Sequence, residues 1–226
     1  MFVQKTSPAL EATKARLIAA ASELFAAKGF HGTKVRDIAQ RAGVNVAAGN
    51  YHYGSKRELY LEVVRAQFAR MRERIETLGA AVQPGALDTL PRAELLRLLR
   101  TRIEVMLETL MGPPENVHAR LMMREMADPS EALPAIVGEM ITPLVEETRQ
   151  IIAHLRPELD RRQVDRVSFS IAGQVHFYRF MMPALLSMLG LQSYSRAFQR
   201  ELVEHVFDFS LGGMDRLAAS NRKGRA

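Results

Sequence analysis

The side chains best suited to specific chemistry lie between residues 33 and 58. Arg36 has a guanidinium that can donate two parallel hydrogen bonds to guanine, and the Asn50 amide can pair with adenine in a similar bidentate way. Residues 46 to 48 are small and apolar, as contact with a thymine methyl group requires. Such side chains read bases only when an ordered element holds them in the major groove, so the local structure decides their role.

The spacing of this segment predicts a helix-turn-helix. Thr33 is expected to cap the first of its two helices, and Gly43 to end it, because a left-handed residue costs glycine little. Asn45 is expected to cap the second helix, over about residues 46–53. Ser55 with Glu58 forms an S-x-x-E capping box that starts the next helix. The inward apolar stripe of the first helix is expected to be Val35, Ile38, Ala39 and Ala42.

The same residues resemble the DNA-binding domain of the TetR family of one-component transcriptional regulators. The resemblance covers about the first quarter of the chain and includes the upstream segment KARLIAAASELFAAKGF. It implies an all-α protein, with an N-terminal three-helix helix-turn-helix domain joined by a long helix to a C-terminal ligand-binding and dimerisation domain. The matching residues are Thr33, Val35, Asp37, Ile38, Ala39, Ala42, Gly43, Val44, Tyr51, His52, Tyr53, Ser55, Lys56, Leu59 and Tyr60.

The resemblance also implies which side chains contact DNA. Arg36 could instead be a solvated charge, and His52 could cap or pack locally. Tyr53 is expected in the core, where the family places an aromatic residue. The base-facing positions are Arg36, Val46, Ala47, Ala48 and Asn50. The phosphate-contacting positions are Tyr51, His52 and Lys56, with support from Thr33, Lys34 and Asn45.

One residue departs from the family pattern. Gly49 occupies a position where the family has a leucine or isoleucine that packs the recognition helix on the first helix. Glycine lacks that side chain and costs about 1 kcal/mol of helix propensity relative to alanine. Either the helix is looser before it meets DNA, or a neighbour such as Phe25 fills the gap.

The charge distribution agrees with a polyanionic partner. Residues 1–80 contain 13 Lys or Arg against 7 Asp or Glu, whereas residues 81–226 contain 18 of each, so the net charge of +6 belongs to the first segment. A chance fluctuation of surface charge is the alternative. The absence of cysteine, of an evident signal peptide and of a long uncharged apolar run suits a cytoplasmic protein.

An enzyme is the main competing class. The six histidines, at 31, 52, 118, 154, 176 and 205, form no H-E-x-x-H pair, and the sequence has no G-x-S-x-G, P-loop or dinucleotide-binding turn. A metal site from His118, His176 and Glu125 would need residues far apart in sequence. We therefore expect no catalytic residues, no metal and no cofactor.

The remaining sequence predicts further helices and no strand. We expect residues 1–80 to form the DNA-binding domain with its connecting helix, and residues 81–226 the effector-binding and dimerisation domain. The first helix is expected over about residues 10–28 and the connecting helix over about 56–78, acting as a lever between the domains. Residues 79–91 form the best linker candidate, and the tail SNRKGRA, residues 220–226, is expected to be disordered. The later helices are expected over about residues 95–111, 117–126, 133–155 with a kink at Pro143, 164–189, and 193–217.

The second domain resembles that of CecR-like (YbiH-type) TetR regulators, through HARLMMREMADPSEALPAIVGEMITPL and GQVHFYRF. This implies a repressor that leaves a palindromic operator when a small molecule enters the helical core; a constitutive DNA-binding regulator without an effector is the alternative. Methionines such as Met111 and Met182 could line an apolar cavity or simply fill the core. The polar candidates could hold a ligand or have structural roles. The ligand candidates are Arg120, Met123, Arg124, Gln174, His176, Tyr178 and Arg179.

A half-site is too short to specify one genomic address, so the resemblance also implies a homodimer on double-stranded DNA. In this family the last two long helices form the dimer interface, here about residues 164–189 and 193–217. Their apolar periodicity is compatible with a four-helix bundle between two copies, but it fits an internal core equally well.

Overall fold

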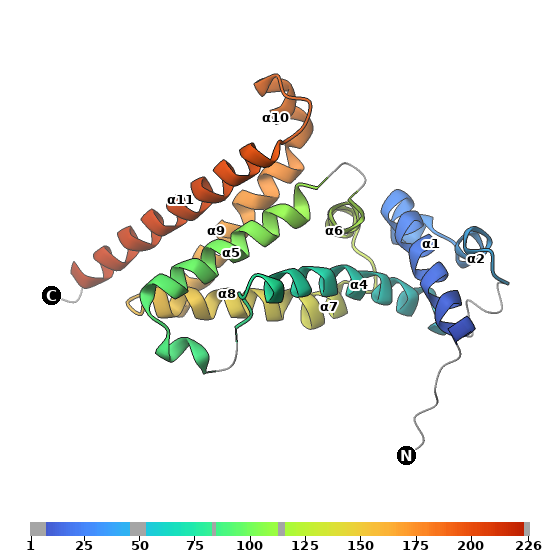
Figure 1. Ribbon diagram of the computed structural model, residues 1–226, viewed down its shortest axis with the longest axis horizontal. Coiled ribbons are helices and arrows are strands. Elements are labelled where there is room, and N and C mark those ends of the chain that lie inside the picture. The colour runs from blue at the N-terminus through green and yellow to red at the C-terminus, as the bar shows by residue number, and fades with distance from the viewer. Residues whose placement is uncertain (1–7, 46–52, 83–84, 113–115, 224–226) are drawn as a thin grey trace, which may run out of the picture. The chain divides into compact units, whose positions relative to one another are not determined.

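The computed structural model describes residues 8–45, 53–82, 85–112 and 116–223. Every regular element in these ranges is a helix, which confirms the expected all-α class (Figure 1). Within the same ranges, each helix is too short or too polar to cross a lipid bilayer.

The chain forms two compact units that do not follow a simple N- and C-terminal division. The first consists of Met1–Ala69 and Glu115–Met140, and the second of Arg70–Pro114 and Ile141–Ala226. The connecting helix passes from the first unit into the second, and a segment from the middle of the chain belongs to the first. The functional division at residues 80 and 81 stays a prediction.

The core of the first unit contains three aromatic rings, from Phe25, Phe30 and Tyr60. Phe25 lies 4.8 Å from the ring of Tyr60 and 6.2 Å from that of Phe30, between ring centroids. Gly29, with φ 73°, breaks the first helix and lets Phe30 turn back onto Phe25. The helices of this unit are α1 (Pro8–Gly32), α2 (Val35–Ala42), the start of α4 (Lys56–Thr77), α6 (Val117–Ala127), α7 (Leu133–Ile136) and most of the π-helical turn η2 (Val137–Ile141).

The second unit is built on four helices whose apolar faces meet in one core. Helix α5 packs against α8, α9 and α11, and both α8 and α11 pack against α9. Buried Leu99, Ile103, Ile151, Val175 and Val206 illustrate this shared core. The elements that follow the end of α4 in this unit are η1 (Ala86–Thr89), α5 (Arg92–Leu110), α8 (Thr142–Leu155), α9 (Arg161–Phe180), α10 (Met182–Leu189) and α11 (Arg196–Lys223).

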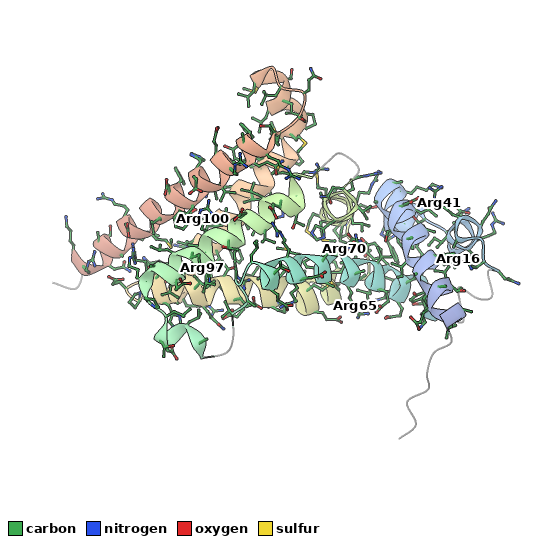
Figure 2. All side chains as sticks on the ribbon, viewed as in Figure 1. Arg16, Arg41, Arg65, Arg70, Arg97 and Arg100 are labelled. Carbon is green, nitrogen blue, oxygen red and sulfur yellow. The ribbon has the colours of Figure 1, made fainter. Side chains whose placement is uncertain are left out.

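The linker candidate is held to the second unit by arginines of α5. Arg97 (Figure 2) donates to the backbone oxygens of Leu78 at 3.4 Å and Gly79 at 3.0 Å. Buried Arg102 donates to the Ala80 oxygen at 3.2 Å and to Glu147. These guanidiniums satisfy carbonyls where α4 ends, and their charge suits the negative end of the helix dipole.

Two of the helices expected from the sequence are divided close to a proline, and the end of the chain differs from the prediction. The helix expected over residues 133–155 is divided by a π-helical turn, and Pro143 lies directly after it in the first turn of α8. The single helix expected over residues 164–189 is wrong, because α9 ends at Phe180 and α10 begins at Met182, with Pro183 in its first turn. The expectation of a disordered tail over residues 220–226 is wrong for residues 220–223, because α11 continues to Lys223.

Candidate DNA-binding surface

Helix α2 and its turn follow the predicted pattern at the C-terminal end. Ile38, Ala39 and Ala42 are buried, while Val35 is only partly covered. Gly43 adopts φ 64° and ψ 37°, and its N–H donates to the Gln40 oxygen at 3.2 Å. This left-handed cap confirms the predicted end of the helix and lets the chain turn at once.

Thr33 does not cap α2, which corrects the prediction. The residue at the N-cap is Lys34, and no side chain bonds to the first turn. The Thr33 hydroxyl instead bonds to the backbone oxygen of Gly29 at 2.8 Å and lies 3.2 Å from that of Leu24. With 1% of its surface exposed, Thr33 supports the junction of α1 and α2, and it is a poor candidate for a phosphate contact.

The cations of α2 fall into two groups. Arg41 (Figure 2) binds Glu23 of α1, and Asp37 lies 3.9 Å from the Lys28 ammonium. Lys34 and Arg36 are exposed and have no acidic partner in the part of the chain that the structure describes. The charges of Lys34 and Arg36 are therefore available to an external anion, and that of Arg41 is already neutralised.

The start of α4 is capped as predicted, although the capping box is incomplete. The Glu58 N–H donates to the Ser55 hydroxyl oxygen at 3.1 Å, whereas the Glu58 carboxylate pairs with Arg57. Lys56 places its ammonium 4.3 Å from the centre of the Phe30 ring. Partial burial lowers the pKa of Lys56, while the nearby Glu131 opposes that change. The ammonium is thus anchored on the core of the first unit.

Much of the predicted recognition helix lies outside the described residues. Asn45 is described just before it, so the expected helix cap cannot be compared with its helix. The predicted roles of the recognition residues and of Gly49 stay predictions. The predicted DNA-binding residues outside the described ranges are Val46, Ala47, Ala48, Asn50, Tyr51 and His52.

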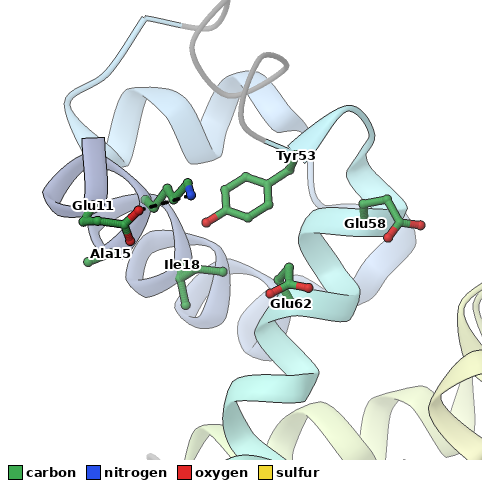
Figure 3. A pocket seen from close by; sticks show the side chains of 7 residues that line it. Glu11, Ala15, Ile18, Tyr53, Glu58 and Glu62 are labelled. Carbon is green, nitrogen blue, oxygen red and sulfur yellow. Dashed lines mark hydrogen bonds and ion pairs between the residues drawn. The ribbon is translucent and has the colours of Figure 1, made fainter. Parts of the chain in front are cut away.

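Tyr53 is not enclosed in the core, contrary to expectation. Its ring faces a hollow of about 670 Å³ between α1 and α4, opposite Ile18 and close to Glu11 and Glu62 (Figure 3). Burial raises the pKa of the Tyr53 phenol, and the charges of Glu62 and Glu11 raise it further. Three glutamates and one lysine line the hollow, so its charge disfavours a bound phosphate.

Two ligand candidates, Arg120 and Arg124, lie on α6 of the first unit, and Arg124 makes hydrogen bonds within that unit. Arg124 of α6 donates to the backbone oxygens of Ala26 at 3.0 Å and Ala27 at 2.6 Å, near the end of α1. Arg120 is half-buried on the same helix, one turn earlier. Arg124 therefore caps a helix of the DNA-binding unit, a role that only the packing of α6 on α1 reveals.

Glu125 is a buried carboxylate with three hydrogen-bond donors. The Tyr60 hydroxyl of α4 donates to it at 2.8 Å, and Ser130 donates through its N–H at 3.0 Å and its hydroxyl at 2.9 Å. Only 1% of the Glu125 surface is exposed. This network joins α6, the turn after it and α4 within one unit, and sequence reasoning did not foresee it.

The other ligand candidates also have internal contacts. In the second unit, Gln174 contacts the Ser170 oxygen and the Ser210 hydroxyl at 3.3 Å, and His176 contacts the Ala172 oxygen at 2.7 Å. The backbone oxygen of Tyr178 accepts a hydrogen bond from the Tyr194 hydroxyl, and the Arg179 guanidinium lies 3.7 Å from the Met182 sulfur. Met123 is half-buried on α6 of the first unit. A ligand-binding role for these residues stays a prediction.

Comparisons with known proteins bear on both parts of the chain. Residues 17–63 match the family described as bacterial regulatory proteins, tetR family, and residues 94–214 match the C-terminal domain of the HTH-type transcriptional dual regulator CecR. The CecR of Shigella flexneri is 31% identical over 150 residues, which are 63% of this chain and 64% of that protein. The RutR regulator of Escherichia coli K12 is 25% identical over 89% of this chain and 90% of its own length.

Solved structures agree on the fold. A TetR-family regulator from Mesorhizobium loti has a TM-score of 0.58 and 18% identity, covering 93% of this chain and 98% of its own. The CecR-type match covers more than half of the chain and includes α6, which the structure places with the helix-turn-helix helices. The chain therefore belongs to the TetR family of DNA-binding transcriptional regulators, in the group with a CecR-type C-terminal domain.

Proposed function

We propose that this protein is a homodimeric repressor that a small molecule releases from a palindromic operator. The DNA-binding part is supported by Lys34 and Arg36 at the start of α2, two exposed cations with no acidic partner among the described residues. Arg36 is assigned to a guanine edge and Lys34 to a phosphate, because a guanidinium can bond bidentately to guanine and a lysine acts as a point charge.

The DNA assignment is tested by comparing two arginines of the same helix. The operator is first selected in vitro from random DNA, and affinity is then measured by fluorescence anisotropy over a range of salt concentrations. Arg36→Ala should cost about 1–3 kcal/mol and relax specificity at one base pair. Arg41→Ala removes the same charge but one already bound to Glu23, so it should change affinity little. Equal losses from both variants would contradict the assignment.

The homodimer is supported by phenylalanines that lie on the surface of the last long helices. Phe180 is 70% exposed on α9 and Phe209 66% exposed on α11. Gly173 and Gly212 lie near them in sequence, and a side chain added at either would meet open space. Because α9 and α11 pack together within one chain, two copies could bury these faces as a four-helix bundle. Phe169 and Phe177 extend the same apolar face of α9.

Light scattering tests this interface. Phe209→Glu should place a charge in the buried seam and convert the dimer to monomer at micromolar concentration. Met126→Glu introduces the same charge at an exposed methionine of α6 and should leave the dimer intact. A wild-type monomer, or a dimer unaffected by Phe209→Glu, would refute the proposed interface.

Release by a ligand requires a differential affinity between two states of the dimer. Helix α4 is continuous from Lys56 to Thr77 and belongs to both compact units, so it can transmit a change between them. Retention of operator DNA in the presence of every small molecule that binds the protein would favour the alternative, a constitutive regulator. A reporter gene under the selected operator tests whether the protein represses or activates transcription. If it is a repressor, removal of the protein should raise expression of the reporter.

A further inference from the structure

The second unit contains a hollow of about 690 Å³ that none of the seven predicted ligand residues lines. Its walls come from the end of α4, the C-terminal part of α5, α10 and the start of α11. In Figure 1, α10 and the first turns of α11 lie together at one end of this unit. The volume falls within the usual range for small-molecule sites.

The floor of the hollow is apolar. Leu107, Met111 and Val203 line it and are buried, and Met182 and Leu186 line it from α10 with part of their surface exposed. Both methionines were candidates for an adaptable cavity on sequence grounds. Thioether and branched aliphatic side chains give such a surface affinity for an apolar body of variable shape.

Among the residues that line the hollow, three arginines stand against two glutamates. The Glu108 carboxylate is bound by Arg74 at 3.0 Å, and Glu104 lies 3.5 Å from Arg100 (Figure 2), which also binds Glu204 of α11. Arg196 and Arg200, in the first turns of α11, have no acidic partner among the described residues. The hollow thus joins an apolar floor to two exposed guanidiniums that lie four residues apart on one face of α11.

From this arrangement we propose that the hollow binds the effector, and that the effector is an organic anion with an apolar body, of the monocarboxylate class. Arg196 and Arg200 bind the carboxylate, because paired N–H groups match its two oxygens. Leu107, Met182 and Leu186 contact the apolar body. This inference rests on the proposed ligand-released repressor, and it adds the site and the chemical class.

Calorimetry with decanoate and 4-phenylbutanoate tests the site directly, in the absence of DNA. Both should bind one per protomer, and decanoate should bind more tightly than decanol or decyltrimethylammonium. Arg196→Ala with Arg200→Ala should weaken decanoate binding about 10- to 100-fold, because bonds to charged groups are lost. Arg70→Ala is the control, since Arg70 is an exposed arginine of α4 outside the hollow (Figure 2).

A second variant tests the apolar floor without changing charge. Leu186→Trp should fill the hollow and weaken decanoate binding, while its melting temperature and helix content show whether the fold is intact. No binding of either carboxylate, no preference for the carboxylate head, or unchanged affinity in the double arginine variant would overturn the inference.

The operator assay separates this failure from failure of the proposed function. If the carboxylates do not bind but the protein still binds its palindrome, the effector inference is wrong and the DNA-binding function stands. If decanoate binds in the hollow and operator affinity is unchanged, the binding site is supported but its assignment as the effector site is wrong. Decanoate binding that lowers operator affinity, and loses this effect in the double arginine variant, would support both.

Discussion

The hydrogen bond between Tyr60 and Glu125 provides the sharpest test of how the CecR-type segment stabilises the DNA-binding unit. Tyr60→Phe removes the hydroxyl that donates to the Glu125 carboxylate at 2.8 Å. The ring contacts with Phe25 and Phe30 remain, so the substitution creates almost no cavity. The lost interaction is therefore one hydrogen bond to a buried charge.

Hydrogen bonds to charged groups contribute about 1.5–3 kcal/mol, so Tyr60→Phe should lower the free energy of unfolding by about 2 kcal/mol. For a chain of this size, that corresponds to a fall of about 4–8 °C in melting temperature. Glu125→Ala should cost more, because it leaves the Tyr60 hydroxyl and both Ser130 donors without their acceptor. Glu125→Gln keeps an acceptor and should cost less than Glu125→Ala.

Urea unfolding at equal protomer concentration measures these differences, and a double-mutant cycle of Tyr60→Phe with Glu125→Ala measures the coupling energy of the pair. Tyr194→Phe is the matched control, because that buried tyrosine donates only to a neutral backbone oxygen at 3.4 Å. A loss in Tyr60→Phe no larger than in Tyr194→Phe, or strictly additive effects in the cycle, would refute the reasoning.

The hydrogen bond between Tyr60 and Glu125 makes the free energy of unfolding depend on pH in the alkaline range. Burial raises the pKa of the Tyr60 hydroxyl well above its usual range, and the hydrogen bond to Glu125 raises it further. The folded state therefore keeps this proton when the unfolded chain loses it. The contribution is complete below about pH 10, the unfolded value, and falls as pH rises above it. Tyr60→Phe should lack this part of the decline.

Three further predictions concern other contacts. Arg124→Met keeps the aliphatic stem but removes the donors to α1, so it should cost about 1 kcal/mol in urea unfolding, whereas Arg120→Met should be nearly neutral. The hydrogen bond to Asp88, and to a smaller extent that to the Gln150 backbone oxygen, raises the pKa of His154. At this exposed site the protonated imidazole contributes less than about 1 kcal/mol to the free energy of unfolding. That contribution is complete below about pH 6.5, the unfolded value, and is lost as pH rises through the folded pKa. His154→Ala should flatten that part of a stability profile between pH 5.5 and 8, and an unchanged slope would contradict it. Gly49→Ile should raise the melting temperature without abolishing operator binding. A lower melting temperature would contradict the prediction that a side chain at position 49 packs the recognition helix on the first helix.

Local signals predicted the helix ends well. Gly43 ends α2 and Ser55 caps α4, because a left-handed backbone and a side-chain acceptor depend on neighbouring residues alone. The same holds for Pro143, whose missing N–H and ring affect only the adjoining turn. Family resemblance and the basic first 80 residues then indicated DNA as the partner.

Side-chain roles were less predictable wherever two distant segments meet. Thr33 has the right type for an N-cap, yet its hydroxyl finds acceptors at Leu24 and Gly29, because α1 turns back at Gly29. Tyr53 fits a core pattern, but its ring faces a hollow whose walls come from α1 and α4. Apolar periodicity predicts which face of a helix is buried, but it does not predict which other helix packs against that face.

The sequence by itself determined the all-α class, the helix-turn-helix family and the excess positive charge, because each depends on short-range pattern. Only the tertiary structure placed α6 in the DNA-binding unit, where Arg124 caps α1 and Glu125 accepts from Tyr60 across 65 residues of sequence. It also pairs Arg41 with Glu23, while Arg36 is exposed and has no acidic partner in the described ranges. The physical reason is that burial and charge pairing depend on which helices pack together, and the spacing within one helix does not contain that information.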